Sequence, residues 1–491
     1  MSLTSTLEQP QGRPVVTDSE VEKVERALID QSASAPLLFL YSSAVLWLLA
    51  STGLGILVTF ELLAPGRFGG FSWLSYGRLW PAFMNALAYG WASQAGMGTA
   101  IWLFARLTRV AIKRPTWLIF GTMFWNISVT IGVVAILCGA QQGHEWLEFP
   151  PYVEFMLFFS FLMIGSWGVT MFRLRRPGHA FISLWYLTGA FFWFAWLYSA
   201  ATLMLHCWGM HGVLQSVVGA WYGGSFLNLW FASLGLGAVY YFIPKVSGKP
   251  VHSYHLAAVG FWSFALLAGW TGMTRLIGGP LPAWLITVSI VATILMLIPI
   301  VTVTLNFVMT LRGNTGLVYV SPTIRFVFFG AVVYAVTGVV AVLGAQRSFA
   351  EYAQYSTFAS GYSLLLIYGF FSMVMFGSIY YIVPRLVGCE WLSSRLINFH
   401  FLGSAYGIGV FVAVLLAGGL WEGGAWSNPE IHYDTAISFL QPAFAGRLLA
   451  WIGLGGAHLL FALHYLTMLL RLGRPAGRPT LFPQHVEGGS H

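Results

Sequence analysis

The chain has 491 residues, of which 57% are hydrophobic and only 8% are charged. Soluble proteins carry about 25% charged residues, so the composition excludes an ordinary soluble protein. The formal net charge is +8, and the placement of the basic residues, described below, excludes a nucleic-acid partner. The cysteines, Cys138, Cys207 and Cys389, are too scattered to predict a disulfide framework or a zinc site.

Apolar runs of twenty or more residues recur along nearly the whole chain, and each can cross the roughly 30 Å of hydrocarbon in a bilayer. We therefore expect an all-α, polytopic membrane protein. Its transmembrane domain, 36–472, follows a cytoplasmic N-terminal segment, 1–35, and precedes a cytoplasmic tail, 473–491. The twelve predicted spans centre on residues 37–63, 81–105, 116–139, 152–172, 180–206, 217–243, 253–274, 283–311, 324–346, 357–384, 398–421 and 441–470.

Lys and Arg concentrate at the two chain ends and in every second loop. The exceptions are Arg67, Arg78, Arg275, Arg347 and Arg447. With an even number of spans, this asymmetry predicts that both termini lie in the cytoplasm, and we expect the chain in a bacterial inner membrane. The basic residues then indicate contact with anionic phospholipids rather than with nucleic acid.

The loops on the other side have a different composition. Segments 140–151, 207–216 and 422–440 lack Lys and Arg but contain acidic residues and Trp. Such loops suit the docking of other membrane subunits or of a basic soluble partner, although an ordinary interfacial belt of aromatic residues has the same composition.

The spacing of the histidines does not predict a metal or haem site within the membrane. His252 and His255 share one helix face, but a hydrated helix end explains them. His458 and His464 are about 240° apart around a helix and therefore cannot share a ligand. The sequence has no H-x-H and no adjacent pair of histidines, whereas haem and copper need converging imidazoles.

Several motifs nevertheless resemble subunit I of the cbb3-type cytochrome c oxidases, in the haem-copper oxidase superfamily. The resemblance covers roughly residues 40–470 and implies the same twelve-helix bundle. The motifs are Gly77-Arg78-Leu79-Trp80-Pro81 with Asn85-Ala86, Trp221-Tyr222-Gly223, Tyr240-Tyr241-Phe242-Ile243-Pro244-Lys245, Lys249-Pro250-Val251-His252-Ser253-Tyr254, Trp270-Thr271-Gly272 to Pro282-Ala283-Trp284, Gly377-Ser378-Ile379-Tyr380-Tyr381-Ile382-Val383-Pro384-Arg385 and Asn398-Phe399-His400-Phe401.

Members of this family bind two haems and a copper ion through six histidines, and the resemblance places another residue at each position here. The haem-ligand positions correspond to Phe83, Tyr362 and Leu364, and the copper-ligand positions to Gly224, Thr274 and Arg275. Phe, Tyr and Leu fill volume that haem would occupy, and the charge of Arg275 opposes a copper ion. The resemblance therefore implies a chain with no catalytic residues and no haem or copper of its own.

Other positions that serve the cofactors in the family have also changed. The cross-linked tyrosine, a glutamate of the ninth span, a serine of the proton path and one arginine near the haem propionates correspond to Ala268, Val340, Ala257 and Trp80, while Arg78 and Arg447 remain. Glu145 and Glu148 preserve part of an outer loop that helps to hold calcium in the family. We expect at most a weak cation site there.

These observations favour a redox-inactive subunit that scaffolds a larger respiratory or electron-transfer complex with membrane-anchored c-type cytochrome subunits. One alternative is an active terminal oxidase or nitric oxide reductase that uses unusual ligands such as Tyr362, Met84 or Met273. Another is quinone binding or ion conduction in the vacated interior, although ionisable residues at membrane depth are few. The sequence leaves the complex and the oligomeric state open.

Overall fold

The structure is a computed structural model that describes residues 18–176, 178 and 180–475. The outer parts of both predicted terminal segments, 1–17 and 476–491, lie outside the described residues. The helices are α1 (Asp18–Leu63), α2 (Tyr76–Asn85), η2 (Ala86–Ala92), α3 (Ser93–Thr108), α4 (Pro115–Cys138), α5 (Pro151–Arg173), α6 (Ile182–Thr202), η3 (Leu203–Cys207), α7 (Val213–Ser225), η4 (Phe226–Ala232), α8 (Ser233–Ser247), α9 (Tyr254–Leu267), η5 (Ala268–Leu276), α10 (Ala283–Leu295), α11 (Leu297–Leu311), α12 (Leu317–Val320), α13 (Pro322–Gly344), α14 (Arg347–Ala353), α15 (Thr357–Leu364), η6 (Leu365–Ser372), α16 (Met373–Val387), α17 (Ser394–Trp426) and α18 (Tyr433–Leu469), with a short turn η1 (Ser72–Leu74).

The described part of the chain confirms the all-α membrane fold. Eleven of its helices are long and apolar enough to cross a membrane. A twelfth long helix, residues 76–108, is formed by α2, η2 and α3 in direct succession. It contains Gly, Ser and Gln, which lower its hydropathy, and it is buried inside the bundle, where these small and polar residues find protein partners.

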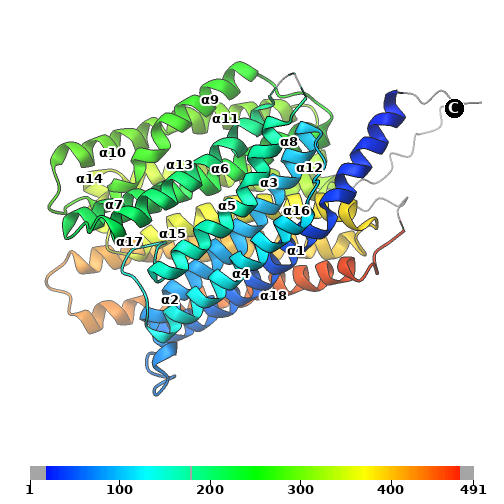
Figure 1. Cartoon of the computed structure of the whole chain (residues 1–491). Coiled ribbons are helices and arrows are strands. Elements are labelled where there is room, and N and C mark those ends of the chain that lie inside the picture. The colour runs from blue at the N-terminus through cyan, green and yellow to red at the C-terminus, as the bar shows by residue number, and fades with distance from the viewer. Residues whose placement is uncertain (1–17, 177, 179, 476–491) are drawn as a thin grey trace, which may run out of the picture.

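The long helices run roughly side by side through the bundle (Figure 1). We call the end that carries Asp18 and the end of α18 the terminal end, and the other the distal end. The windows of highest hydropathy in Val213–Ser247 and Thr357–Val387 are 94% and 100% buried, against 33–50% for the other spans. Helices α7 to α8 and α15 to α16 are therefore central. The predicted ligand positions Gly224, Tyr362 and Leu364 lie on them.

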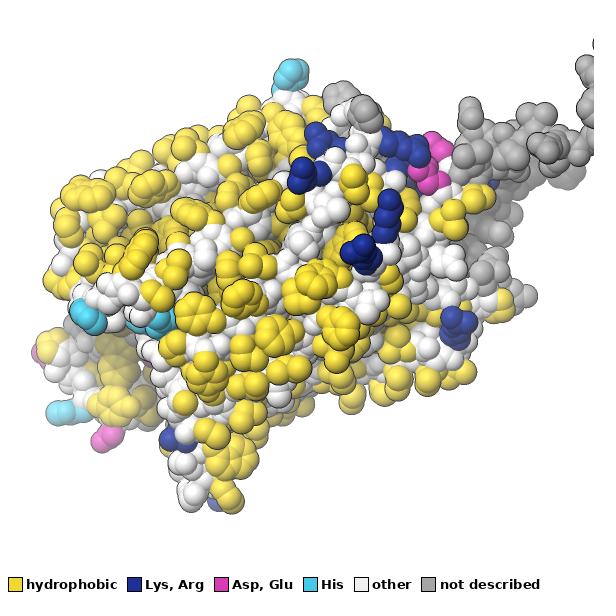
Figure 2. Space-filling model, in the orientation of Figure 1, with side chains coloured by type: hydrophobic (Ala, Val, Ile, Leu, Met, Phe, Trp, Pro, Cys, Tyr) yellow, Lys and Arg dark blue, Asp and Glu magenta, His cyan; other side chains and the backbone are white. Residues whose placement is uncertain are grey.

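The outside of the bundle is largely apolar over most of the face shown in Figure 2, as contact with lipid tails requires. Large apolar side chains on the outside of the bundle include Leu46, Phe159, Trp262 and Leu449. Most of the Lys and Arg side chains visible in Figure 2 gather at the terminal end. This distribution matches the loop assignment made from the sequence.

Helix α1 begins at Asp18, inside the segment that the sequence assigns to the polar N-terminal region. Its N-terminal part carries acidic side chains that form ion pairs with arginines at or just beyond the ends of α3 and α5: Glu22 lies 3.0 Å from Arg109, Glu25 2.5 Å from Arg176 and Asp30 3.5 Å from Arg106. These contacts stabilise the helix beyond its apolar part. Hydropathy does not report ion pairs, so the span predicted from residue 37 begins later than the helix does.

Candidate functional site

Four of the six predicted ligand positions meet at one cavity near the distal end. The cavity has a volume of about 240 Å³, and its lining includes Gly224 of α7, Thr274 and Arg275 of η5, and Tyr362 of α15. Asn228 of η4, Thr271 of η5 and Thr293 of α10 add neutral polar groups to the wall. The structure thus brings together predicted ligand positions that are far apart in the sequence: Gly224 and Tyr362 are separated by 138 positions.

The position of Gly224 is closed by a backbone contact between α7 and η5. A Cβ atom at Gly224 would lie 2.3 Å from the Cα atom of Gly272, and one at Gly272 would lie 2.1 Å from the carbonyl oxygen of Ala220. Glycine is required at both positions because any side chain would collide with backbone. In this arrangement no imidazole fits at residue 224.

Arg275 occupies the adjacent wall and is held by three contacts. Its guanidinium donates hydrogen bonds to the Glu145 carboxylate and, at 3.0 Å, to Ser363 Oγ. The side-chain amide of Gln354 donates to the main-chain carbonyl of Arg275. The Arg275 side chain is 20% exposed and that of Glu145 is 50% exposed, so the ion pair joins the cavity wall to the distal surface.

The other two predicted positions, Phe83 and Leu364, lie outside this cavity, and both are fully buried in the hydrophobic core. The Phe83 ring packs edge-on against Trp451 of α18 with 5.2 Å between ring centroids. Trp451 in turn lies 5.7 Å from the ring of Tyr368. Aromatic packing therefore fills the space around Phe83, and the residues present do not fit a haem or a copper ion at either set of positions.

Of the unusual ligands considered from the sequence, only Tyr362 lines the cavity. Met84 and Met273 are 4% and 3% exposed and are packed in the protein interior outside the cavity wall. Thioethers that fill such positions act as core side chains.

The carboxylates of the predicted cation site already have protein partners. Glu145 pairs with Arg275, and Glu148 accepts a hydrogen bond of 2.8 Å from Asn85 Nδ2. Burial is the main cause that raises the pKa of the Glu148 carboxyl to about 8. The hydrogen bond from Asn85 lowers this pKa, and the negative charge of Glu145 raises it. In the described residues no group of three or more His, Cys, Asp or Glu side chains is placed to hold a metal ion. The weak cation site remains a prediction.

Four π-helical segments in the described residues were not predicted, and three of them begin within three residues after a predicted ligand position. Segments η2, η4 and η6 start three, two and one residues after Phe83, Gly224 and Leu364. π-Helical turns are rare and occur mostly at functional sites. Every residue of η2, η4 and η6 is buried, so their apolar pattern has no exposed face from which a wider turn could be recognised.

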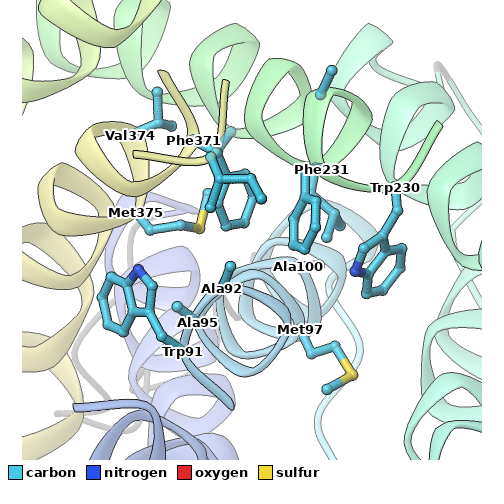
Figure 3. Close-up of a cluster of buried hydrophobic side chains, with 14 of the residues drawn as sticks. Trp91, Ala92, Ala95, Met97, Ala100, Trp230, Phe231, Phe371, Val374 and Met375 are labelled. Carbon is cyan, nitrogen blue, oxygen red and sulfur yellow. The ribbon is translucent and has the colours of Figure 1, made fainter. Parts of the chain in front are cut away.

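Segments η2, η4 and η6 and the helices that follow them pack together at the centre of the bundle. In Figure 3, Phe231 and Phe371 face each other between Trp91 and Trp230, and the two phenylalanine rings are 5.1 Å apart. Trp91 donates a hydrogen bond to Ser372 Oγ at 2.8 Å. Ring packing and side-chain hydrogen bonds hold the centre together.

A buried acidic group near the distal end was also missed. The Glu154 side chain of α5 has no exposed surface, and its Oε2 atom lies 2.9 Å from His206 Nε2. A single acidic residue inside an otherwise apolar span is the signal that identifies it. Close to it, Tyr89 donates to the Trp146 carbonyl at 2.6 Å, and its hydroxyl lies 2.8 Å from that of Tyr222.

His458 and His464, which the spacing separates, have different partners. His458 Nδ1 lies 2.8 Å from Thr52 Oγ1, whereas His464 Nε2 accepts a hydrogen bond of 3.4 Å from the Ser393 amide. A third buried histidine, His400, lies 2.9 Å from the Tyr380 hydroxyl. Each of these imidazoles is hydrogen-bonded through one ring nitrogen within an aromatic core.

The sequence profile of one family, described as Cytochrome C and Quinol oxidase polypeptide I, matches residues 36–457. The chain belongs to this family. It is 24% identical over 418 residues to the Cbb3-type cytochrome c oxidase subunit CcoN1 of Stutzerimonas stutzeri, covering 82% of this chain and 88% of that protein. It is 25% identical over 421 residues to cytochrome c oxidase subunit 1 of Rhodobacter capsulatus, covering 82% and 77%.

The fold of this oxidase subunit I homologue is also found in a solved structure. The structure is described as a heme-copper terminal oxidase dimer that provides insights into its catalytic mechanism. The TM-score is 0.70 at 12% identity, covering 93% of this chain and 85% of the other. The family expected from the motifs is therefore confirmed, and the low identities describe a divergent member.

Proposed function

We propose that this subunit I homologue carries no haem-copper centre and acts as a structural subunit of a larger respiratory or electron-transfer complex. The observation that carries the proposal is the backbone contact at Gly224. A copper-binding imidazole at this position would require α7 and η5 to move apart, because a Cβ atom alone would come within 2.3 Å of Gly272 Cα.

Charge supports the same conclusion. The predicted adjacent copper ligands correspond to Thr274 and Arg275, and Arg275 is a permanent cation in the cavity wall. Its guanidinium is neutralised by Glu145. A guanidinium has no acceptor atom with which to coordinate copper, and no imidazole lies in the cavity wall.

Side-chain packing at the haem-ligand positions also supports the absence of haem. Phe83 and Leu364 are fully buried, and the edge-on contact of Phe83 with Trp451 joins α2 to α18. A haem in the family provides apolar surface between helices, and its loss would leave a cavity that costs stability. Here side chains supply that surface.

The distal end offers a surface for partner subunits. Helices α17 and α18 protrude there as a hairpin (Figure 1), and it exposes Trp421, Trp426 and Tyr433 at 58%, 42% and 66%. Glu422 and Asp434 add negative charge nearby. Aromatic side chains with acidic neighbours suit membrane-anchored c-type cytochrome subunits with basic docking surfaces. The same proposal places the basic terminal end, with both termini, in the cytoplasm of a bacterial inner membrane.

Optical spectroscopy and metal analysis of the purified full-length chain, with its co-purifying subunits, test the proposal. We expect c-type haem only in partner subunits, and no b-type haem or copper stoichiometric with this chain. Stoichiometric b-type haem and copper would instead support an active oxidase or nitric oxide reductase. A related catalytic cbb3-type subunit purified in parallel is the positive control.

A further inference from the structure

The cavity at Gly224, Arg275 and Tyr362 adjoins a second cavity near the distal surface. This second cavity of about 610 Å³ is lined by Gln142, His144, Gln215 and Ser216, and it shares Glu145 and Arg275 with the inner cavity. The ion pair thus forms the wall between the two spaces. A soluble ligand that reached the outer cavity would meet this pair first.

We propose that the inner cavity binds a small organic carboxylate that enters from the distal surface, with Arg275 as its anchor and Glu145 as the group that it displaces. This inference rests on the proposed absence of haem and copper from the cavity. Guanidinium groups bind carboxylates through charge-assisted hydrogen bonds, and Arg275 already donates one such bond to the chain's own Glu145.

The two partners of the ion pair differ in how freely they can move. Glu145 belongs to a loop and is 50% exposed, so its carboxylate can turn into water at little cost. Arg275 is only 20% exposed. Its guanidinium also donates to Ser363, and its carbonyl accepts from Gln354. When Glu145 leaves, these contacts keep Arg275 directed at the cavity.

The rest of the wall fits a short, partly apolar ligand. Val340, Ala341 and Phe358 provide apolar surface opposite Asn228, Thr293 and Tyr362, which provide neutral polar groups. A small number of polar groups in a mostly apolar pocket is the usual form of a small-molecule site. The volume of about 240 Å³ suits a small acid.

Isothermal titration of the full-length chain in nanodiscs tests the proposal, with benzoate as the probe and benzamide as its neutral analogue. We expect benzoate to bind and benzamide to bind at least about tenfold more weakly, because one charge-assisted hydrogen bond contributes on this scale. Arg275→Gln should weaken benzoate binding by about tenfold or more, and Glu145→Gln should strengthen it by about tenfold, since it removes the internal competitor. The matched control is Arg347→Gln, because Arg347 is a distal arginine that donates to Thr287 away from the cavity.

Benzoate affinity should fall in Arg275→Gln and rise in Glu145→Gln. Misfolding would not raise the affinity, so the rise separates an effect on the ligand site from misfolding. Equal binding of benzamide, unchanged binding in Arg275→Gln, or no binding of benzoate would overturn the proposal. The haem spectrum of the same preparation distinguishes the two proposals. If the chain is free of haem and does not bind benzoate, only the carboxylate site is refuted. If it contains stoichiometric b-type haem, the proposed function on which the carboxylate site rests is refuted.

Discussion

The contact between Gly224 and Gly272 leads to a quantitative prediction. A Cβ atom at residue 224 would lie 2.3 Å from the Cα atom of Gly272, whereas ordinary contacts begin at 3.4 Å. The Gly224→Ala variant therefore has to separate α7 from η5 by about 1 Å or bend one of them. Overpacking against side chains costs about 1–3 kcal/mol. Because the obstacle here is backbone, we expect a loss of about 3 kcal/mol.

The measurement is the thermal unfolding of the full-length variant in detergent, followed by fluorescence-detected size exclusion. The matched control is Gly453→Ala on α18, where an added Cβ would meet nothing within 4 Å. This control should unfold at or slightly above the wild-type temperature, because alanine favours a helix over glycine by about 0.5–1 kcal/mol. If Gly224→Ala is as stable as Gly453→Ala, residue 224 has room for a side chain, and the argument against a copper ligand there is refuted.

Three further variants test the other parts of the site. Phe83→Ala should lose about 3–5 kcal/mol of stability, because it leaves a void against Trp451, and a wild-type melting temperature in detergent would contradict this. The raised pKa of Glu148, about 8, means that the folded state favours the protonated carboxyl. Stability should therefore be full below the unfolded pKa near 4.5 and fall as the pH rises towards 8. Glu148→Gln should remove that decline in melting scans between pH 4.5 and 8, and parallel wild-type and variant curves would show that Glu148 does not titrate in this way. His206→Phe leaves the buried Glu154 carboxyl without its partner and should cost about 1–3 kcal/mol in the same assay, whereas in the double variant with Glu154→Leu much of that loss should be recovered.

The sequence predicted the fold because membrane insertion depends on local composition. Any run of about twenty apolar residues can satisfy its own backbone hydrogen bonds as a helix in lipid, so the spans could be located one by one. Motifs such as those around Trp221 and Trp270 then indicated the family, and the resemblance assigned Gly224, Arg275 and Tyr362 to copper-ligand and haem-ligand positions. The structure places these three in one cavity.

The details of the site depend on long-range packing and were not accessible from the sequence. The approach of Gly224 to Gly272 and the pairing of Arg275 with Glu145, 130 residues apart, require the tertiary arrangement of three segments. Hydropathy ended the predicted span 253–274 just before Arg275 but did not indicate Glu145 as its partner. Glu154 was overlooked because one acidic residue does not disturb an apolar run.

Native mass spectrometry of the intact complex, followed by release of this chain in the gas phase, tests most directly whether the chain carries haem and copper. We expect a released subunit whose mass is that of the 54.1 kDa polypeptide, with haem masses found only on partner subunits. A released chain that retains a b-type haem and a copper ion would contradict this expectation.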